Sequence, residues 1–368
     1  MESLDFISGE DFRTSLEADC RELESCMKAG AWKAVHVLAG SIIEAVLIEY
    51  LTVAGYQAKT SIDPLKMDLA QAIAACRKEG VLTEKTEQLS SAIKSYRNLI
   101  HPGRKIRLGE EIDENGARVA QALVDIVVKE VSARRRQNYG YTALQIVSKL
   151  ERDSSALAIL EHLLKSMNGS ELEQLLLRAI PERYMARKAD WGEQEFLESL
   201  LRCFRLAFDI APNGVKGKVA RRFVAILKEE GEDLVLTYET RFFRGSDLRY
   251  LSPEEAALVK QHILSRLSED IGLSILQAVH GLGAFLAPNE VGQFVDAMVR
   301  TMIWGKTEPL KQKARERIET EYWEMEEEAK KGMMKRLDDW IGHFRHKDQA
   351  EFAGTVEEMK AFLDIVAF

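Results

Sequence analysis

Residues 34–55 read AVHVLAGSIIEAVLIEYLTVAG, a stretch that is apolar enough and long enough to cross a membrane as a helix. Glu44 and Glu49 lie within it, and a carboxylate is expensive to place in hydrocarbon. A helix buried among other protein helices avoids that cost. We therefore predict a central bundle helix over residues 32–54 and no membrane contact.

The flanking sequence predicts further helices of the same bundle. Residues 11–30 carry Phe12, Leu16 and Cys20 at helical spacing, and residues 114–134 carry a row of alanines and valines on one face. Two more helices are expected between them, at 65–78 and at 83–101, the second beginning with Thr83 as its N-cap. These segments predict a compact helical bundle over residues 1–136.

Residues 140–368 form a second predicted part, also all-α. Amphipathic segments recur between Pro, Gly and Asn breaks, which favours an α-solenoid or irregular helical array, although no strict repeat period is present. The long segments include 171–179, 253–269, 309–345 and 348–366. Residues 233–243 alternate enough for a strand, but such a strand would have no partner. Between the two parts, we expect the tract Arg134–Arg135–Arg136 to complement a helix end and stay solvated.

The composition indicates an ordinary globular protein. Of 368 residues, 59 are acidic and 51 basic, which argues against a broad nucleic-acid-binding surface but permits a local basic patch. Four cysteines without a CxxC pair favour a reduced setting, and the acidic start MESLD is unlike a signal peptide. We expect a cytoplasmic protein that needs no metal or cofactor, since no metal-ligand spacing or phosphate-binding loop occurs.

The segment with the clearest chemical content is YRNLIHPGR, residues 96–104. Pro102 and Gly103 end the predicted fourth helix, and its apolar stripe includes Tyr96 and Ile100. Arg97 and His101 are four residues apart, so they project together from the edge of that stripe.

This pairing suits cleavage of RNA without a metal. A histidine can move the proton of the 2′-hydroxyl near neutral pH, and an arginine can hold two phosphate oxygens as charge develops. Further cations are available for the RNA backbone, namely Lys94, Arg104, Lys105 and Arg107. Taken alone, an Arg-x3-His pair is equally compatible with a histidine that caps a helix end.

Three segments within residues 5–135 resemble the HEPN superfamily of helical-bundle domains, many of which are ribonucleases of toxin and antiviral systems. They are EDFRTSLEADCREL (10–23), WKAVHVLAGSIIEAVLIEYL (32–51) and YRNLIHPGR. The resemblance implies that Arg97 and His101 are the catalytic pair and Asn98 the polar residue after the arginine. It also implies a homodimer in which two motifs line one cleft. The sequence departs from the family in having fewer residues between arginine and histidine, and in having Gly103 where some toxins carry a tyrosine.

Glu44 is the remaining candidate. It shares a helix row with the small residues Gly40 and Ser41, which would let another helix approach closely. A buried glutamate needs a cationic or donor partner, so we hypothesise that Glu44 orients Arg97. A hydrogen bond to the backbone or to Tyr50, with no part in chemistry, is the equally weighted alternative.

These observations predict a metal-independent endoribonuclease of HEPN type, with an anti-phage or toxin role implied by the resemblance. The helical region after residue 140 would then bind a partner, sense a trigger or restrain the nuclease. The alternative is a non-catalytic dimerisation or RNA-binding scaffold in which Arg97 and His101 only stabilise a helix end.

Overall fold

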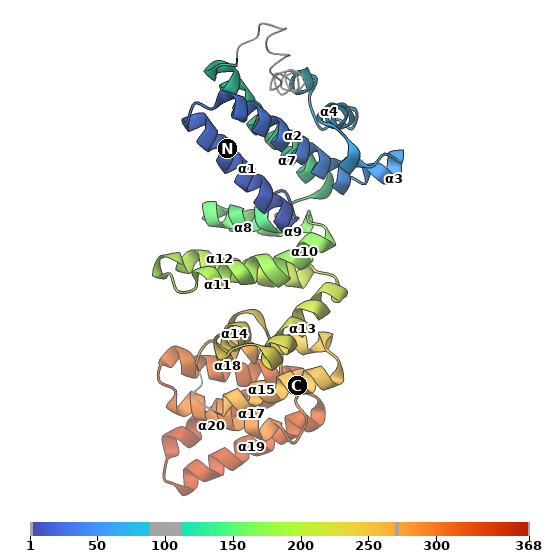
Figure 1. Ribbon diagram of the computed structural model, residues 1–368. Helices are drawn as coiled ribbons and strands as arrows, with labels where there is room; N and C mark the ends of the chain where they lie inside the picture. Colours follow the sequence, from blue (N-terminus) through green and yellow to red (C-terminus); the bar gives the residue numbers. More distant parts are fainter. Residues whose placement is uncertain (1–2, 89–111, 269–271, 367–368) are drawn as a thin grey trace. The chain divides into compact units, whose positions relative to one another are not determined.

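The computed structural model describes residues 3–88, 112–268 and 272–366, and every regular element in these ranges is a helix (Figure 1). The predicted all-α class is therefore confirmed. Contacts divide the chain into two compact units, unit 1 (Met1–Leu200) and unit 2 (Leu201–Phe368). This division falls inside α12 (Gln194–Ile210), and the boundary predicted at residues 136–140 lies within unit 1.

Unit 1 is built around α2 (Trp32–Val53), which packs against α1 (Glu10–Lys28), α4 (Leu69–Lys78) and α7 (Glu114–Tyr139) (Figure 1). Its buried residues include Ile42, Ile43, Val46 and Leu47, each worth about 1.5–3 kcal/mol of transfer free energy. α2 is the one helix of the described chain that is long and apolar enough to span a bilayer. In this fold its apolar side chains fill the bundle core.

Short helices complete unit 1: α3 (Tyr56–Thr60), α8 (Ala143–Arg152), α9 (Leu160–Lys165), α10 (Gly169–Gln174) and α11 (Ile180–Arg187). α8 begins with a capping box in which Thr142 and Gln145 exchange hydrogen bonds. The prolines were expected to separate helices, but Pro181 lies in a continuous helical run. The π-helical turn η3 (Leu175–Ala179) precedes it, and such a turn relaxes the local hydrogen-bond register.

Unit 2 contains the end of α12 and eight further helices: α13 (Asn213–Glu229), α14 (Glu232–Thr237), α15 (Pro253–Leu267), α16 (Ile275–Ala278), α17 (Val291–Trp304), α18 (Glu308–Glu324), α19 (Glu327–His346) and α20 (Ala350–Val366). Two expectations are wrong here. The possible strand at 233–243 is α14 followed by the π-helical turn η5 (Tyr238–Phe242). The single helix at 309–345 is two helices, broken at Met325, whose backbone is extended.

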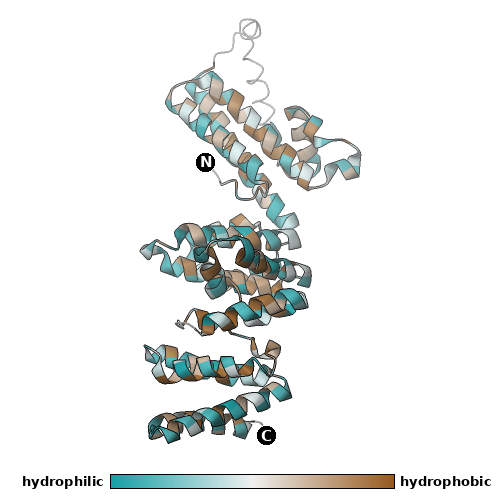
Figure 2. Cartoon of the chain, turned by 60° about the horizontal axis from the view of Figure 1, so that its bottom comes forward, coloured by the Kyte–Doolittle hydropathy of each residue, from teal (hydrophilic) through white to brown (hydrophobic). Residues whose placement is uncertain are grey.

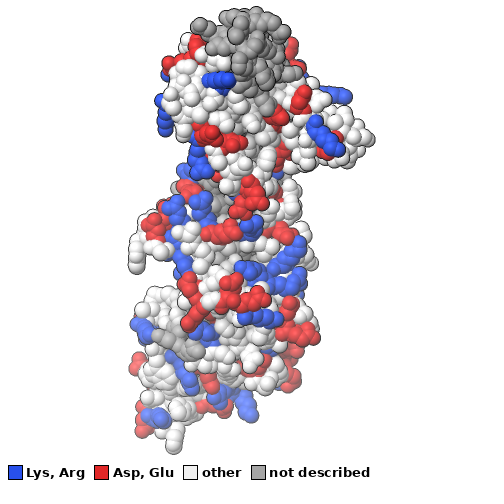
Figure 3. Space-filling model, viewed as in Figure 1, with Lys and Arg blue, Asp and Glu red and all other residues white. Residues whose placement is uncertain are grey.

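Most helices carry a hydrophobic and a hydrophilic face, as Figure 2 shows by its brown and teal stripes. The apolar faces turn inward within each unit, which is how amphipathic helices form a core. On the face drawn in Figure 3, basic and acidic side chains are interspersed over the described surface. That distribution agrees with the formal net charge of −8 and with the absence of a broad basic field on this face.

Candidate functional site

The predicted catalytic motif lies outside the described residues. This applies to Arg97, Asn98 and His101, and equally to the expected RNA-binding cations Lys94, Arg104, Lys105 and Arg107. Their arrangement, and the dimer cleft that the resemblance implies, therefore stay predictions. What the structure does describe is the scaffold on both sides of this segment.

The helix that leads into the motif is fixed to α7. Residues 84–88 are helical, and the backbone amide of Thr86 donates to the hydroxyl of Thr83 at 3.2 Å, which confirms the predicted N-cap. Glu130 of α7 accepts hydrogen bonds from the Thr83 amide at 3.1 Å and from the Thr86 hydroxyl at 2.8 Å. These contacts hold the helical segment 84–88 against α7.

The described chain that follows the motif segment begins with α7. Asp113 caps this helix by accepting a hydrogen bond from the amide of Gly116 at 2.8 Å. Gly116 lies against His36 of α2, and an added Cβ would stand 3.3 Å from the ring nitrogen Nε2. His36 is buried.

Glu44 lies on α2 and is half-buried. Its predicted partner Arg97 falls outside the described residues, so the pairing stays a hypothesis. The hydroxyl of Tyr50, named above as an alternative partner, accepts a hydrogen bond from Asn138 at 3.1 Å.

The arginine tract near residue 135 differs from its prediction. Arg135 is only 5% exposed and contacts three polar groups: Glu49 at 3.5 Å, the hydroxyl of Ser8 at 2.8 Å and Glu171 at 3.9 Å. Glu171 also accepts hydrogen bonds from Ser8 and from the amide of Ala143. The expectation of a solvated arginine is wrong for Arg135, because its partners come from helices far apart in the sequence.

Burial dominates the electrostatics of this cluster. Desolvation raises the pKa of Glu49 above its ordinary value, although the guanidinium of Arg135 acts in the opposite direction. The neighbouring charge of Glu171 adds to the rise. Arg135 therefore compensates for part of the burial of Glu49.

A groove lined by cations lies in unit 1 between α7, α8 and the N-terminal segment, with a volume of about 400 Å³. Its basic residues are Lys129, Arg136, Lys149 and Arg152. Lys149 and Arg152 have carboxylates of Asp153 and Asp5 within 3.8 Å and 3.3 Å. Within the described ranges, Lys129 and Arg136 have no carboxylate partner, and the guanidinium carbon of Arg136 lies 5.6 Å from the ring centre of Tyr141.

We did not predict this groove from the sequence. Lys149 and Arg152 share one face of α8 with Gln145, and Lys129 and Arg136 are two turns apart on α7. Such rows are visible in the sequence as helical spacing. Their union into one groove is not, because it depends on how α7 packs against α8.

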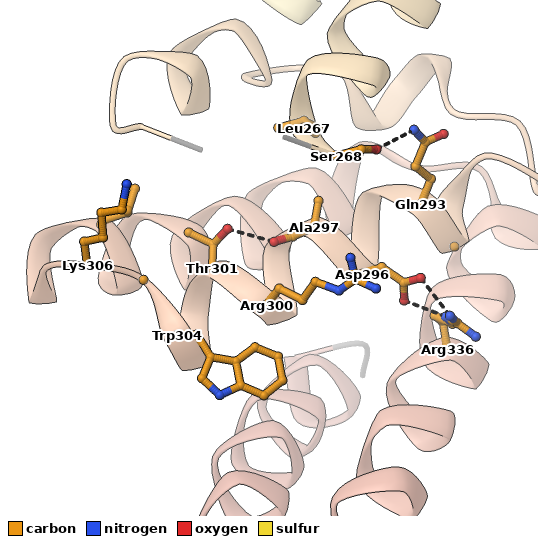
Figure 4. A pocket seen from close by; sticks show the side chains of 13 residues that line it. Leu267, Ser268, Gln293, Asp296, Ala297, Arg300, Thr301, Trp304, Lys306 and Arg336 are labelled. Atoms are coloured by element: carbon orange, nitrogen blue, oxygen red, sulfur yellow. Dashed lines mark hydrogen bonds and ion pairs between the residues drawn. The ribbon is translucent and has the colours of Figure 1, made fainter. Parts of the chain in front are cut away.

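A larger recess, of about 560 Å³, lies in unit 2 along α17 (Figure 4). Asp296 accepts hydrogen bonds from both Arg336 and Trp340 there. Burial opposes ionisation of Asp296, but these donors and the nearby Arg300 hold its pKa below the ordinary value. The half-exposed indole of Trp304 lines the same recess (Figure 4). The lining offers cationic and aromatic contacts without a paired nucleophile and base.

No protein family, curated protein or solved structure matches this chain. The resemblance to the HEPN superfamily therefore depends on the three quoted segments alone.

Proposed function

We propose that this protein is a metal-independent endoribonuclease in which Arg97 and His101 carry out the reaction. The observation that carries the proposal is the Arg-x3-His pair of YRNLIHPGR, placed in the sequence between the helix at 84–88 and α7. Asn98 would contact the scissile phosphate beside Arg97, and Glu44 of α2 would orient the guanidinium. A homodimer would bring two such motifs to one cleft.

The chemistry needs only these side chains. His101 would remove the proton of the 2′-hydroxyl, whose oxygen then attacks the adjacent phosphorus. As the bond from phosphorus to the 5′-oxygen of the next nucleotide breaks, the protonated His101 would return this proton to the leaving 5′-oxygen. Arg97 would stabilise the additional negative charge of the pentacoordinate phosphorus with two parallel N–H donors. The products would be a 2′,3′-cyclic phosphate and a 5′-hydroxyl.

The cation-lined groove of unit 1 supports RNA as the substrate. Lys129 and Arg136 present positive charge that no carboxylate neutralises in the described part of the chain, and Tyr141 provides an aromatic surface beside them. Unpaired cations beside an aromatic ring are suited to binding a nucleic acid, through its backbone phosphates and its bases. Because the protein carries a net charge of −8, RNA would bind at a confined basic patch and not over the whole surface, and this groove is such a patch.

The first test is cleavage of labelled tRNA and mRNA by the full-length protein in EDTA, compared with Arg97→Ala and His101→Ala. We expect the wild type to cut and both variants to lose at least about a hundredfold in rate. Arg118→Ala is the matched control, because Arg118 is an exposed cation of α7 paired with Glu114. A folded wild-type protein that cuts nothing would favour the scaffold alternative. Cleavage that appears only with added Mg²⁺ would refute the metal-independent mechanism.

A separate experiment tests the groove, by measuring the affinity of the His101→Ala protein, which should not cleave, for RNA. Adding Lys129→Glu and Arg136→Glu is expected to weaken binding and to reduce the slope of log K against log salt by roughly two, one for each lost phosphate contact. Binding that is unchanged in affinity and in salt dependence would exclude the groove from RNA contact.

A further inference from the structure

A crevice of about 340 Å³ in unit 2 lies between α14 with the turn η5 on one side and α15 on the other. Its apolar wall is formed by Leu227, Val235 and Leu236. Its polar lining comprises Glu230, Glu232, Glu239, His262 and Arg266. The volume is at the lower end of the range of small-molecule sites, about 300–1,000 Å³.

Glu239 is the unusual residue of this crevice. It is 1% exposed, yet neither of its carboxylate oxygens has a hydrogen-bond partner. The nearest groups are Nε2 of His262, 3.5 Å from Oε1, and Nε of Arg266, 3.7 Å from Oε2. The buried Nε2 of His262 also has no hydrogen-bond partner.

Three other buried carboxylates of the described chain accept hydrogen bonds on both of their oxygens. Glu321 is fully buried and accepts hydrogen bonds from the amides of Gly281 and Gly283, one on each oxygen. Both oxygens of Asp247 and both of Glu171 also accept hydrogen bonds. Glu239 differs from these three, and also from Glu49, which lacks a donor on Oε2 alone. A buried carboxylate without a hydrogen-bond donor on either oxygen is strongly destabilising unless something else supplies the donors.

The backbone around Glu239 also indicates a binding site. It lies in the π-helical turn η5, and single π-helical turns occur frequently at functional sites. The turn places Glu239 on the crevice lining together with His262 of α15. A carboxylate oxygen of Glu239 and a ring nitrogen of His262 therefore lie side by side on the lining of the crevice.

We propose that this crevice binds a small aliphatic amine or guanidine. Its N–H groups would donate to the carboxylate of Glu239 beside His262, and its methylene chain would lie along Leu227, Val235 and Leu236. Glu230 and Glu232 make the lining more acidic, so that three carboxylates outnumber the one guanidinium of Arg266. The described residues contain no group of three His, Cys, Asp or Glu that could hold a metal ion, which favours an organic cation.

The test is calorimetric titration of the full-length protein with agmatine and with spermidine at constant ionic strength. We expect saturable binding to the wild type and a loss of about tenfold or more in Glu239→Gln, because a hydrogen bond to a charged group is removed. Glu254→Gln is the matched control, since Glu254 is an exposed acid at the start of α15 outside the crevice. Its affinity should equal that of the wild type.

Glu232→Lys provides a second variant that should fold normally, because Glu232 is exposed. It is expected to weaken binding several-fold by placing a like charge in the crevice lining. The proposal is overturned if neither probe binds the wild type saturably. It is also overturned if Glu239→Gln and Glu254→Gln bind equally, since binding would then be a general attraction to an acidic protein.

Discussion

Arg135→Met is the substitution that most directly tests the buried cluster of unit 1. Methionine keeps an unbranched chain of similar length and removes the charge. Glu49 then loses the cation that lies 3.5 Å away, whereas Glu171 retains its hydrogen bonds from Ser8 and Ala143. The destabilisation should therefore arise mainly at Glu49.

The magnitude follows from the protonation of Glu49. An ionised carboxylate buried without its partner can take up a proton, and doing so at pH 7 from an ordinary pKa of 4.5 costs about 3.4 kcal/mol. The lost hydrogen bond to Ser8 adds about 1 kcal/mol. The wild type already bears part of the proton-uptake cost, because the pKa of its Glu49 is raised, so the sum of about 4.4 kcal/mol is an upper limit. It lies within the roughly 3–5 kcal/mol found when one partner of a buried ion pair is removed.

Hydrogen exchange of the α7 amides is the appropriate assay, because it reports on unit 1 alone. The expected loss of stability accelerates exchange of the slowest amides by about two to three powers of ten at pH 7. At pH 5 the proton-uptake contribution falls to at most about 0.7 kcal/mol, while the lost hydrogen bond to Ser8 still contributes about 1 kcal/mol. The acceleration should therefore fall to roughly five- to twentyfold, after correction for the intrinsic exchange rate. Adding Glu49→Gln should restore most of the protection. An acceleration of exchange below tenfold at pH 7, or one that is the same at pH 7 and pH 5, would show that Arg135 does not stabilise the ionised carboxylate of Glu49.

Three further predictions concern single residues. The folded-state pKa of Glu49 is raised, so ionisation of Glu49 lowers the free energy of unfolding as the pH rises above 4.5. In urea unfolding, Glu49→Gln should therefore be more stable than the wild type at pH 7 and equal to it at pH 4.5. Gly140→Ala should lower stability by roughly 3 kcal/mol or more in thermal unfolding, since Gly140 has φ +79° and an added Cβ would stand 1.7 Å from the carbonyl oxygen of Ser166. Gly342→Ala should instead raise stability by about 0.5–1 kcal/mol in the same assay, because Gly342 lies in the last two turns of α19 with open space around it. Iodoacetamide at pH 8 should label half-buried Cys26 first and Cys76 only after unfolding, because burial raises the pKa of Cys76 to about 12; mass spectrometry of the labelled peptides checks the order.

Much of the helical pattern was predictable because apolar periodicity is a local property. The helices predicted at 11–30 and 32–54 correspond to α1 and α2 within two residues. Periodicity fails where helices meet without a breaking residue. Met325 and Glu326 separate α18 from α19 with neither Gly nor Pro, so the apolar pattern runs through the break and predicts one helix.

For the candidate site too, some features were predictable from the sequence and others were not. The motif of Arg97 and His101 was predicted from its spacing and from the Pro-Gly pair after it, and it stays a prediction. The N-cap at Thr83 is the part of this region that the structure confirms. The groove of Lys129 and Arg136 was not predicted, because the sequence gives no measure of which helix faces adjoin.

The helical class, the burial of α2 within the protein and the residue types near residue 100 were predictable from the sequence, since these depend on residue type and spacing along one helix. Tertiary structure decided which charges are buried. Arg135 meets Glu49 and Glu171, and Glu239 meets His262, only after distant helices pack together. Burial and charge pairing are properties of three-dimensional neighbours, and local periodicity carries no information about them.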